Sequence, residues 1–289
     1  MRTSLQSTTD RDVDAILAER LAHPRYEVLP LPGIEEQVLA HVPRNVTITV
    51  TASPRKGLDP TVNASTRLAA AGYNVVPHIS ARLVRDHAHL DEVLRTLLDA
   101  GVRELFVPAG DAPRPAGQFA QAAELLAAIG PRRARFKAIG ITGYPETHHL
   151  ISDEATIAAM FAKAPMATCI ISQICFDPRA IEAWIASVRA RGTLLPIWIG
   201  LPGVIDYPKL ARISLQIGIQ ESTRFLRAHG SWVTRLLTRQ FRPHRLLHDL
   251  ATTIADPRST VLGFHFYTFN ELAHTERWRA QMLDRLAVR

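Results

Sequence analysis

Eight short runs of apolar and β-branched residues recur along this chain, and segments with helical periodicity separate them. This alternation limits the fold most strongly, because repeated strand–helix units build a parallel sheet covered by helices. Eight units predict an α/β fold of the (β/α)8 barrel type, with an open doubly wound sheet as the alternative. The predicted strands are Tyr26–Leu29, Val46–Thr51, Asn74–His78, Glu104–Pro108, Phe136–Thr142, Thr168–Cys175, Leu194–Ile199 and Val261–Thr268.

The intervening segments carry the apolar stripe of a helix that packs on one side. One stripe runs from Leu90 to Leu98 and stops before Gly101, a residue type that commonly ends helices. Similar patterns cover 119–129 and 181–191, and the longer stretch 207–255 has room for two or three helices.

No low-complexity linker divides the 289 residues, and barrels of this class often reach such a length as one domain. We therefore expect a single catalytic barrel over residues 23–289. Residues 1–22 are expected to form a short N-terminal extension, either an added helix or a mobile tail, since Asp12–Leu21 has helical composition.

The composition, with 47% hydrophobic and 21% charged residues, is that of a soluble globular protein. No run approaches the ~20 apolar residues of a membrane span, and Met1–Arg11 lacks the apolar segment of a signal peptide. Cys169 and Cys175 are the only cysteines, which excludes a disulfide framework and favours a cytoplasmic location. Both are predicted to be small buried packing residues.

The chain is basic, with 34 Lys and Arg against 27 Asp and Glu, a formal net charge of +7. Much of the excess lies in the segment 224–245. Most of its arginines are interpreted as a solvated helical face, although one or two could bind an anionic ligand. No nucleic-acid-binding motif accompanies them, so neither nucleic acid nor membrane is expected as a partner, and the oligomeric state stays open.

Polar residues gather at the C-terminal ends of the predicted strands, where the active site of a barrel lies. Buried polar groups need partners or a ligand, so these residues predict a site rather than scattered core polarity. His87 and His89 begin a helix and are interpreted as a surface or capping pair, and no metal site is expected. The strand-end residues are Glu27, Thr51, His78, Asp111, Tyr144, His148, Gln173, His265, Tyr267 and Asn270.

In this order, the strand-end motifs resemble those of the methylenetetrahydrofolate reductase family, from Tyr26 to about Asn270. The most specific are Tyr-Pro-Glu-x-His, Gln before Phe-Asp, and His-Phe-Tyr-Thr. The matching residues are Tyr26-Glu27, Thr49-Val50-Thr51, Pro77-His78, Gly110-Asp111, Gly143-Tyr144-Pro145-Glu146-x-His148, Lys163, Ser172-Gln173-x-x-Phe176-Asp177 and His265-Phe266-Tyr267-Thr268-x-Asn270.

The resemblance implies a (β/α)8 reductase that converts methylenetetrahydrofolate to methyltetrahydrofolate with hydride from NADH or NADPH, usually through FAD. It implies Glu27 as general acid, Asp111 beside the pterin and the cofactor, and Gln173 as a pterin ligand. Phe225 is expected to form an apolar wall for the substrate, and Arg224 or Arg227 to meet its carboxylates. The implied cofactor contacts are Thr51, His78, Gly110, Ala120, Tyr144, His148 and Lys163.

Several residues depart from the family pattern at positions that hold the flavin. An arginine lost from a phosphate site removes a charge-assisted contact, so we expect weak or absent FAD binding and direct hydride transfer from the nicotinamide. The departures are Ala52, Ala109, Thr156, Ala159 and Ala162.

Glu27 lies on an apolar strand, where desolvation would raise its pKa and keep it protonated near neutral pH. His78 and His148 are interpreted as either structural residues or cofactor contacts, His265 and Tyr267 as structural, and the main alternative for Lys163 is a solvated side chain. Two other functions remain open: a catalytically silent barrel that binds folate or nucleotide, and a reductase of another pterin or imine.

Overall fold

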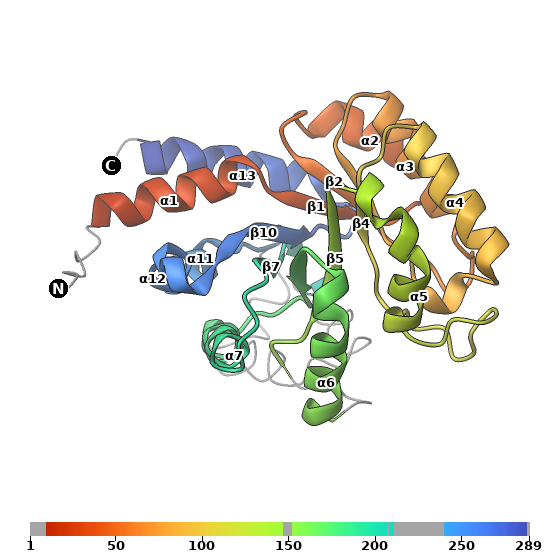
Figure 1. Cartoon of the computed structure of the whole chain (residues 1–289). Coiled ribbons are helices and arrows are strands. Elements are labelled where there is room, and N and C mark those ends of the chain that lie inside the picture. The colour runs from red at the N-terminus through yellow and green to blue at the C-terminus, as the bar shows by residue number, and fades with distance from the viewer. Residues whose placement is uncertain (1–9, 147–151, 207, 211–239, 288–289) are drawn as a thin grey trace.

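The computed structural model describes residues 10–146, 152–206, 208–210 and 240–287, and shows a (β/α)8 barrel (Figure 1). Eight parallel strands are ordered β3-β2-β1-β10-β7-β6-β5-β4. Each lies within or overlaps one of the eight runs predicted from the sequence, which confirms the fold class. The strands are β1 Arg25–Val28, β2 Thr47–Val50, β3 Val75–Pro77, β4 Glu104–Phe106, β5 Ala138–Gly143, β6 Cys169–Ser172, β7 Ile197–Pro202 and β10 Val261–Tyr267.

The two edge strands of this sheet, β3 and β4, meet just after β3 ends. The amide of Ile79 donates to the carbonyl of Phe106 at 2.8 Å, and His78 forms an isolated parallel bridge with Phe106. This contact joins the edges, and it places His78 at the rim of the barrel.

Strand β7 runs to Pro202, three residues beyond the end predicted from the sequence. Gly200 permits this extension, because a Cβ atom there would lie 2.2 Å from the carbonyl oxygen of Ser172. The glycine thus lets β7 pass close to the end of β6.

Helices cover the outside of the barrel, and a short antiparallel pair, β8 (Ile205–Asp206) with β9 (Gln240–Phe241), lies apart from the main sheet. None of the helices in the described ranges has the length and apolarity to cross a membrane. The helices are α1 Asp10–Ala22, α2 Ile34–His41, α3 Asp59–Ala70, α4 His87–Asp99, α5 Ala122–Ile129, α6 Asp153–Lys163, α7 Pro178–Ala190, α11 His244–Asp249, α12 Ala251–Ala255 and α13 Leu272–Ala287; the 3-10 turns are η1 Ala81–Leu83, η2 Gly130–Arg135, η3 Ala164–Met166 and η4 Pro257–Ser259.

Helix α4 begins with a side-chain cap that involves one of the paired histidines. Asp86 accepts a hydrogen bond from the amide of His89, and Nδ1 of His89 accepts one from the amide of Arg85. His87 packs edge to face on Phe119. The structure therefore agrees with the capping interpretation for His89, whereas His87 makes a packing contact.

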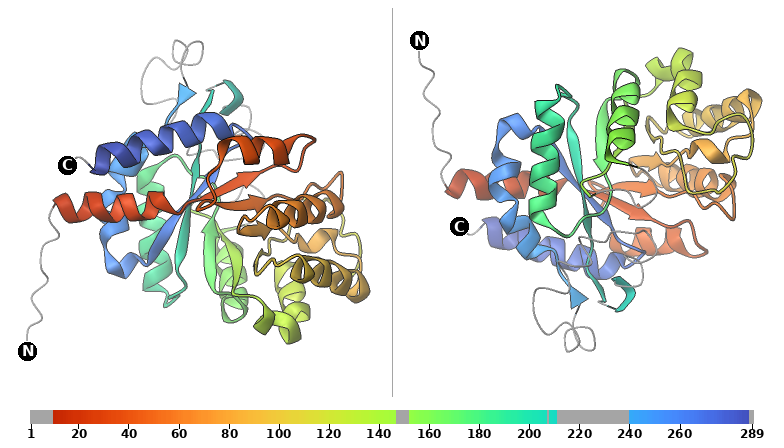
Figure 2. Two further views of the ribbon diagram at one scale, coloured as in Figure 1. Left: turned by 90° about the horizontal axis from the view of Figure 1, so that it is seen from above. Right: turned by 90° about the horizontal axis from the view of Figure 1, so that it is seen from below.

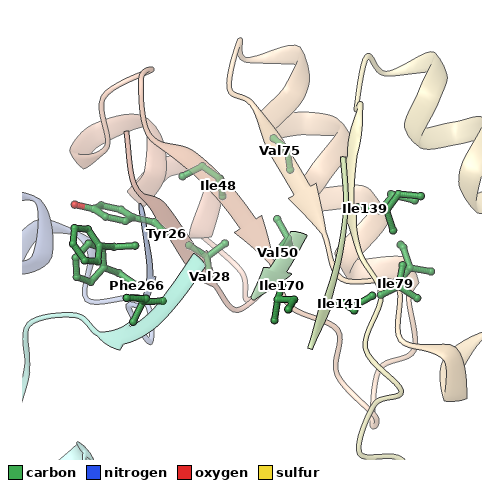
Figure 3. Close-up of a cluster of buried hydrophobic side chains, with 14 of the residues drawn as sticks. Tyr26, Val28, Ile48, Val50, Val75, Ile79, Ile139, Ile141, Ile170 and Phe266 are labelled. Atoms are coloured by element: carbon green, nitrogen blue, oxygen red, sulfur yellow. The ribbon is translucent and has the colours of Figure 1, made fainter. Parts of the chain in front are cut away.

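The main core lies between the sheet and the helices. Alternate residues of the short strands point outward into it, including Tyr26, Val28, Ile48 and Val50 (Figure 3). Burial of such side chains contributes about 25 cal/mol per Å² of apolar surface. Both cysteines are buried and free, as predicted.

A separate, smaller cluster comprises Val76, Phe106, Ile171 and Trp198, which come from β3, β4, β6 and β7. Its members come from four different barrel strands and do not belong to the main core. We assign this cluster to the barrel interior, as inward-facing layers of branched and aromatic residues fill such barrels.

The segment before β1 is helical, and α1 lies beside α13 (Figures 1 and 2). Leu17 and Leu21 of α1 are buried, and Arg279 of α13 donates to the carbonyl of Leu21 at 3.0 Å. The described part of the extension is therefore a packed helix.

Candidate active site

Glu27 is the central residue of the candidate site, and strand β1 determines where its side chain points. Tyr26 and Val28 belong to the outer core, so the strand alternation turns Glu27 toward the barrel interior. The side chain of Glu27 is 14% exposed. Burial raises the pKa of Glu27 from its ordinary 4.5 to about 7, because a carboxylate loses hydration in this position.

Two histidines face the carboxyl group of Glu27. Nε2 of His265, on β10, lies 3.1 Å from Oε2 of Glu27, and Nε2 of His78 lies 3.8 Å from the same oxygen. Burial lowers the pKa of His78 to about 4, against the attraction of Glu27, and burial together with the charge of Arg25 lowers the pKa of His265 to about 3. Both imidazoles are therefore neutral near pH 7, and neither supplies Glu27 with a cationic partner.

Several buried polar atoms near Glu27 lack a hydrogen-bond partner among the described residues. Thr49, which is paired in register with Glu27, has a buried hydroxyl without a partner among the described residues. The same holds for Nε2 of His78 and Nδ1 of His265. Buried polar atoms are seldom left unpaired, so this cluster marks a place that water or a ligand can occupy.

The three side chains could also be considered as metal ligands. One donor atom each from Glu27, His78 and His265 lies within 4.8 Å of the other two, and His₂Glu sets occur in zinc enzymes. However, a metal-bound histidine almost always donates its second ring nitrogen to an acceptor. Nδ1 of His265 has no such acceptor in the described part of the chain, and we therefore interpret the group as an acid among neutral imidazoles.

Two tyrosines connect Glu27 with Asp111. Burial raises the pKa of Tyr267 well above 10, with further contributions from Glu27 and then from Tyr144; the Tyr267 hydroxyl donates to the carbonyl of Ser172 at 3.1 Å. Burial also raises the pKa of Tyr144, and Asp111 adds to this effect. Glu27 thus interacts electrostatically with Tyr267, Tyr267 with Tyr144, and Tyr144 with Asp111.

Asp111 follows β4 on a turn, and its side chain is exposed. The preceding Gly110 has φ +91°, and a Cβ atom there would also lie 2.9 Å from that of Ser80. Only glycine fits this turn without strain. Asp111 is thus an exposed carboxyl group that follows a glycine turn, in contrast to the largely buried Glu27.

Gln173 follows β6 and is held by its own loop. Its backbone amide donates to the carbonyl of Gly143 at 2.7 Å, and its side-chain Oε1 accepts from the backbone amide of Ile174 at 3.0 Å. Within the described ranges, the side-chain NH₂ donates no hydrogen bond to the protein. Gln173 is thus oriented through its oxygen, and its donors remain for a ligand.

Lys163, at the end of α6, is buried, contrary to the alternative of a solvated side chain. Its Nζ donates to Oγ1 of Thr142 at 2.9 Å, and burial lowers its pKa to about 8. It forms no ion pair with a described carboxylate. A buried ammonium with this single hydrogen bond is suited to bind an anion.

The remaining predicted site residues divide into three groups. The backbone amide of Thr51 donates to the carbonyl of Val28, next to Glu27 on β1, and the carbonyl of Ala120 accepts a hydrogen bond from Arg82. Four predicted residues lie outside the described ranges: His148, Phe225, Arg224 and Arg227. Of the positions that depart from the flavin pattern, Ala109, Ala159 and Ala162 are exposed, and Ala52 and Thr156 are half-buried.

The sequence-based interpretation of His265 as a structural residue did not include its contact with Glu27. A signal existed, because a histidine in the middle of the apolar run 261–267 needs a polar partner. In a closed barrel the last strand pairs with the first, and the register indeed places Arg25 beside His265 and Glu27 beside Tyr267.

The sequence matches the family described as methylenetetrahydrofolate reductase over residues 34–278. A curated relative, methylenetetrahydrofolate reductase 2 of Saccharomyces cerevisiae, is 28% identical over 134 residues, which are 43% of this chain and 22% of the relative. The match thus spans about a fifth of that relative's length. Among solved structures, that of oxaloacetate acetylhydrolase with the inhibitor 3,3-difluorooxalacetate has a TM-score of 0.48 and 11% identity, covering 84% of this chain and 93% of that one. A likeness at this level carries no functional argument.

Proposed function

Since this chain belongs to the methylenetetrahydrofolate reductase family, we propose that it is an oxidoreductase that reduces methylenetetrahydrofolate to methyltetrahydrofolate with hydride from NADH or NADPH. The observation that supports this most strongly is the carboxyl group of Glu27. It is largely buried, it faces two neutral imidazoles, and its pKa of about 7 leaves it substantially protonated at neutral pH. An acid with a pKa near the working pH is what proton transfer to a leaving nitrogen requires.

The reaction needs one proton and one hydride. In the first step, Glu27 donates its proton to the departing nitrogen, the carbon–nitrogen bond of the five-membered ring breaks, and a methylene iminium cation remains. In the second step, the nicotinamide C–H bond breaks and its electron pair forms the new C–H bond of the methyl group. Solvent returns the proton to Glu27, so charge and atoms balance over one turnover.

Asp111 and Gln173 have complementary tasks in this proposal. The carboxylate of Asp111 stabilises the iminium cation electrostatically in this proposal. The side-chain NH₂ of Gln173, which has no acceptor among the described residues, donates to the amide-like edge of the pterin. Thr51 is assigned to the nicotinamide and Phe225 to the aryl group of the substrate.

The residues at the expected flavin positions do not provide the side chains that would bind the phosphates of FAD. Ala109 and Ala162 are exposed alanines where arginines would meet the phosphates, and they offer no cation. Lys163 is retained as a cation among these positions, and its Nζ donates one hydrogen bond to Thr142, which leaves further N–H donors for a phosphate of the dinucleotide. We therefore assign hydride transfer directly to the nicotinamide, with Lys163, Tyr144, His78, Gly110, Ala120 and His148 as contacts for the dinucleotide.

The test combines a spectrum with an assay of the purified protein. We expect no flavin absorbance near about 450 nm, and NADH or NADPH consumption that matches methyltetrahydrofolate formation without added FAD. A yellow protein whose activity follows its flavin content would overturn direct transfer but keep the reductase assignment.

A second candidate function rests on the same alanines. Loss of cofactor-binding side chains is also compatible with a catalytically silent barrel that binds folate. Tight folate binding without any NADH or NADPH oxidation would favour this alternative, and faster reduction of a competing pterin or imine would redirect the substrate assignment.

A further inference from the structure

His265 is fully buried and directly contacts the proposed acid, although the reaction as described does not use it. Strand β10 fixes its position from both sides. Phe264 and Phe266 point into the outer core, and Thr268, the residue after β10, donates to the carbonyl of Glu27 at 2.5 Å. The backbones that carry Glu27 and His265 are therefore tied together, and the 3.1 Å contact between their side chains is preorganised.

The unpaired ring nitrogen indicates which tautomer His265 adopts. If Nδ1 carried the proton, a buried N–H donor would have no acceptor among the described residues. If Nε2 carries it, that hydrogen bonds to Oε2 of Glu27, and the unpaired atom is an acceptor. Buried donors without partners are the rarer case in proteins, so the Nε2–H tautomer is favoured.

We propose that His265 is a positioning residue for Glu27: its Nε2–H holds Oε2, so that the acidic proton resides on Oε1 and is directed to the substrate. The hydrogen bond from His265 to Glu27 follows from their contact, while the transfer of the Glu27 proton to the substrate rests on the proposed function. A carboxyl group free to rotate would place its proton on either oxygen and lose the orientation on which proton transfer depends.

The other groups that face Glu27 do not perform this task. His78, which follows β3, is too far away at 3.8 Å for a good hydrogen bond. Tyr267, from β10, donates to Ser172 instead. Arg25, two residues earlier on β1, pairs with Glu104 at 2.8 Å, and its charge helps keep both histidines neutral.

The first test uses two substitutions that differ in where they place a donor. In His265→Gln the side-chain NH₂ can replace Nε2–H, whereas the shorter His265→Asn cannot reach Glu27. We expect kcat to fall about 10- to 100-fold in His265→Asn, as for loss of a hydrogen bond to a charged group, with little change in KM for folate and recovery in His265→Gln. The control is His89→Asn, which alters a buried histidine of α4 far from the acid in sequence and is expected to leave kcat unchanged.

The pH profile separates positioning from a packing defect. Loss of the donor destabilises the carboxylate form of Glu27, so the falling limb of kcat is expected to move to higher pH in His265→Asn and to stay in place in His265→Gln. An unmoved limb in His265→Asn, or equal losses in both variants, would contradict the proposal.

A measurement on the wild-type protein tests the tautomer of His265 even if the variants do not fold. Nitrogen NMR of ¹⁵N-histidine-labelled protein, with the His265 signals assigned through His265→Gln or by scalar correlation, reports which ring nitrogen is protonated. We expect Nε2–H between pH 6 and 8, and protonation of Nδ1 would overturn the proposal. This result does not depend on turnover, so a protein with Nε2–H that fails to reduce folate would refute the proposed function alone.

Discussion

Arg25 and Glu27 lie two residues apart on β1, and both point into the barrel, but their surroundings are opposite. Arg25 donates to Glu104 at 2.8 Å and stacks on Trp198 at 4.2 Å, and Asn74 donates to the other oxygen of Glu104 at 3.0 Å. Among the described residues, Glu27 has two neutral imidazoles, the Tyr267 phenol and an unpaired threonine hydroxyl near it, but no cationic partner. One strand therefore carries a compensated charge in one layer and an uncompensated acid in the next.

The contrast between Arg25 and Glu27 distinguishes a structural polar group from a reactive one. A buried ion pair with further hydrogen bonds is costly to break, but each of its members keeps its ordinary ionisation state. A buried acid without a cationic partner shifts its pKa instead, and such shifts concentrate at functional sites. The comparison predicts that substitutions in the two layers have separable effects on activity and on stability.

The largest expected effect is on turnover in Glu27→Gln. Removal of the only assigned proton donor should lower kcat about 10²- to 10⁴-fold, with folate binding nearly unchanged because the amide has a similar shape. Steady-state kinetics and folate titration measure the two quantities. Turnover within a few-fold of the wild type would remove Glu27 from the role of acid.

The second effect is on stability in Glu104→Gln. Arg25 would keep its charge in a buried position without a carboxylate, which typically lowers the free energy of unfolding by about 3–5 kcal/mol. Urea denaturation measures this loss, and kcat of the folded fraction is expected to stay within the same order of magnitude. A large loss of kcat at unchanged stability would show that the two layers are not separable.

The third effect is the pH dependence of stability. Glu27 has a raised folded pKa, so its contribution to stability is lost as pH rises from about 4.5 to about 7. His78 and His265 have lowered folded pKa values, so their contributions are gained as pH rises from about 4 to 6.5 for His78 and from about 3 to 6.5 for His265.

Glu27→Gln removes the opposing contribution of the acid, and it also removes the attraction that raises the pKa of His78, which acts in the same direction. Between pH 4.5 and 6.5, we therefore expect the free energy of unfolding to rise more steeply in the variant, by at most about 1.4 kcal/mol per pH unit. Denaturation curves at several pH values test this, and parallel pH dependences would show that Glu27 ionises alike in the folded and unfolded chain.

The smallest effect is expected for Lys163→Met, which tests whether the buried ammonium serves the dinucleotide. Loss of one contact to an anion should raise KM for NADH or NADPH about tenfold at constant kcat, and stability should change little because the buried ammonium that is removed forms no ion pair with a described carboxylate. An unchanged KM would assign Lys163 to structure.

The strands could be predicted because their apolar runs bury both faces, and all eight runs contain or overlap a barrel strand. The inward direction of Glu27 also follows from strand alternation. The contact of Glu27 with His265 was not predicted, because it joins residues 238 positions apart and depends on the pairing of β1 with β10. The neutral state of the histidines depends on burial and on Arg25, which no local pattern reveals. The roles of Asp111, Gln173 and the cofactor contacts remain predictions.

The protonation of Glu27 can be followed directly by infrared spectroscopy. The C=O stretch of a protonated carboxyl group, taken as the difference between the wild type and Glu27→Gln, reports Glu27 alone during a pH titration. Our account predicts that this band persists at pH 6 and disappears with a midpoint near pH 7. A carboxyl group that is already fully ionised at pH 5.5 would contradict the account.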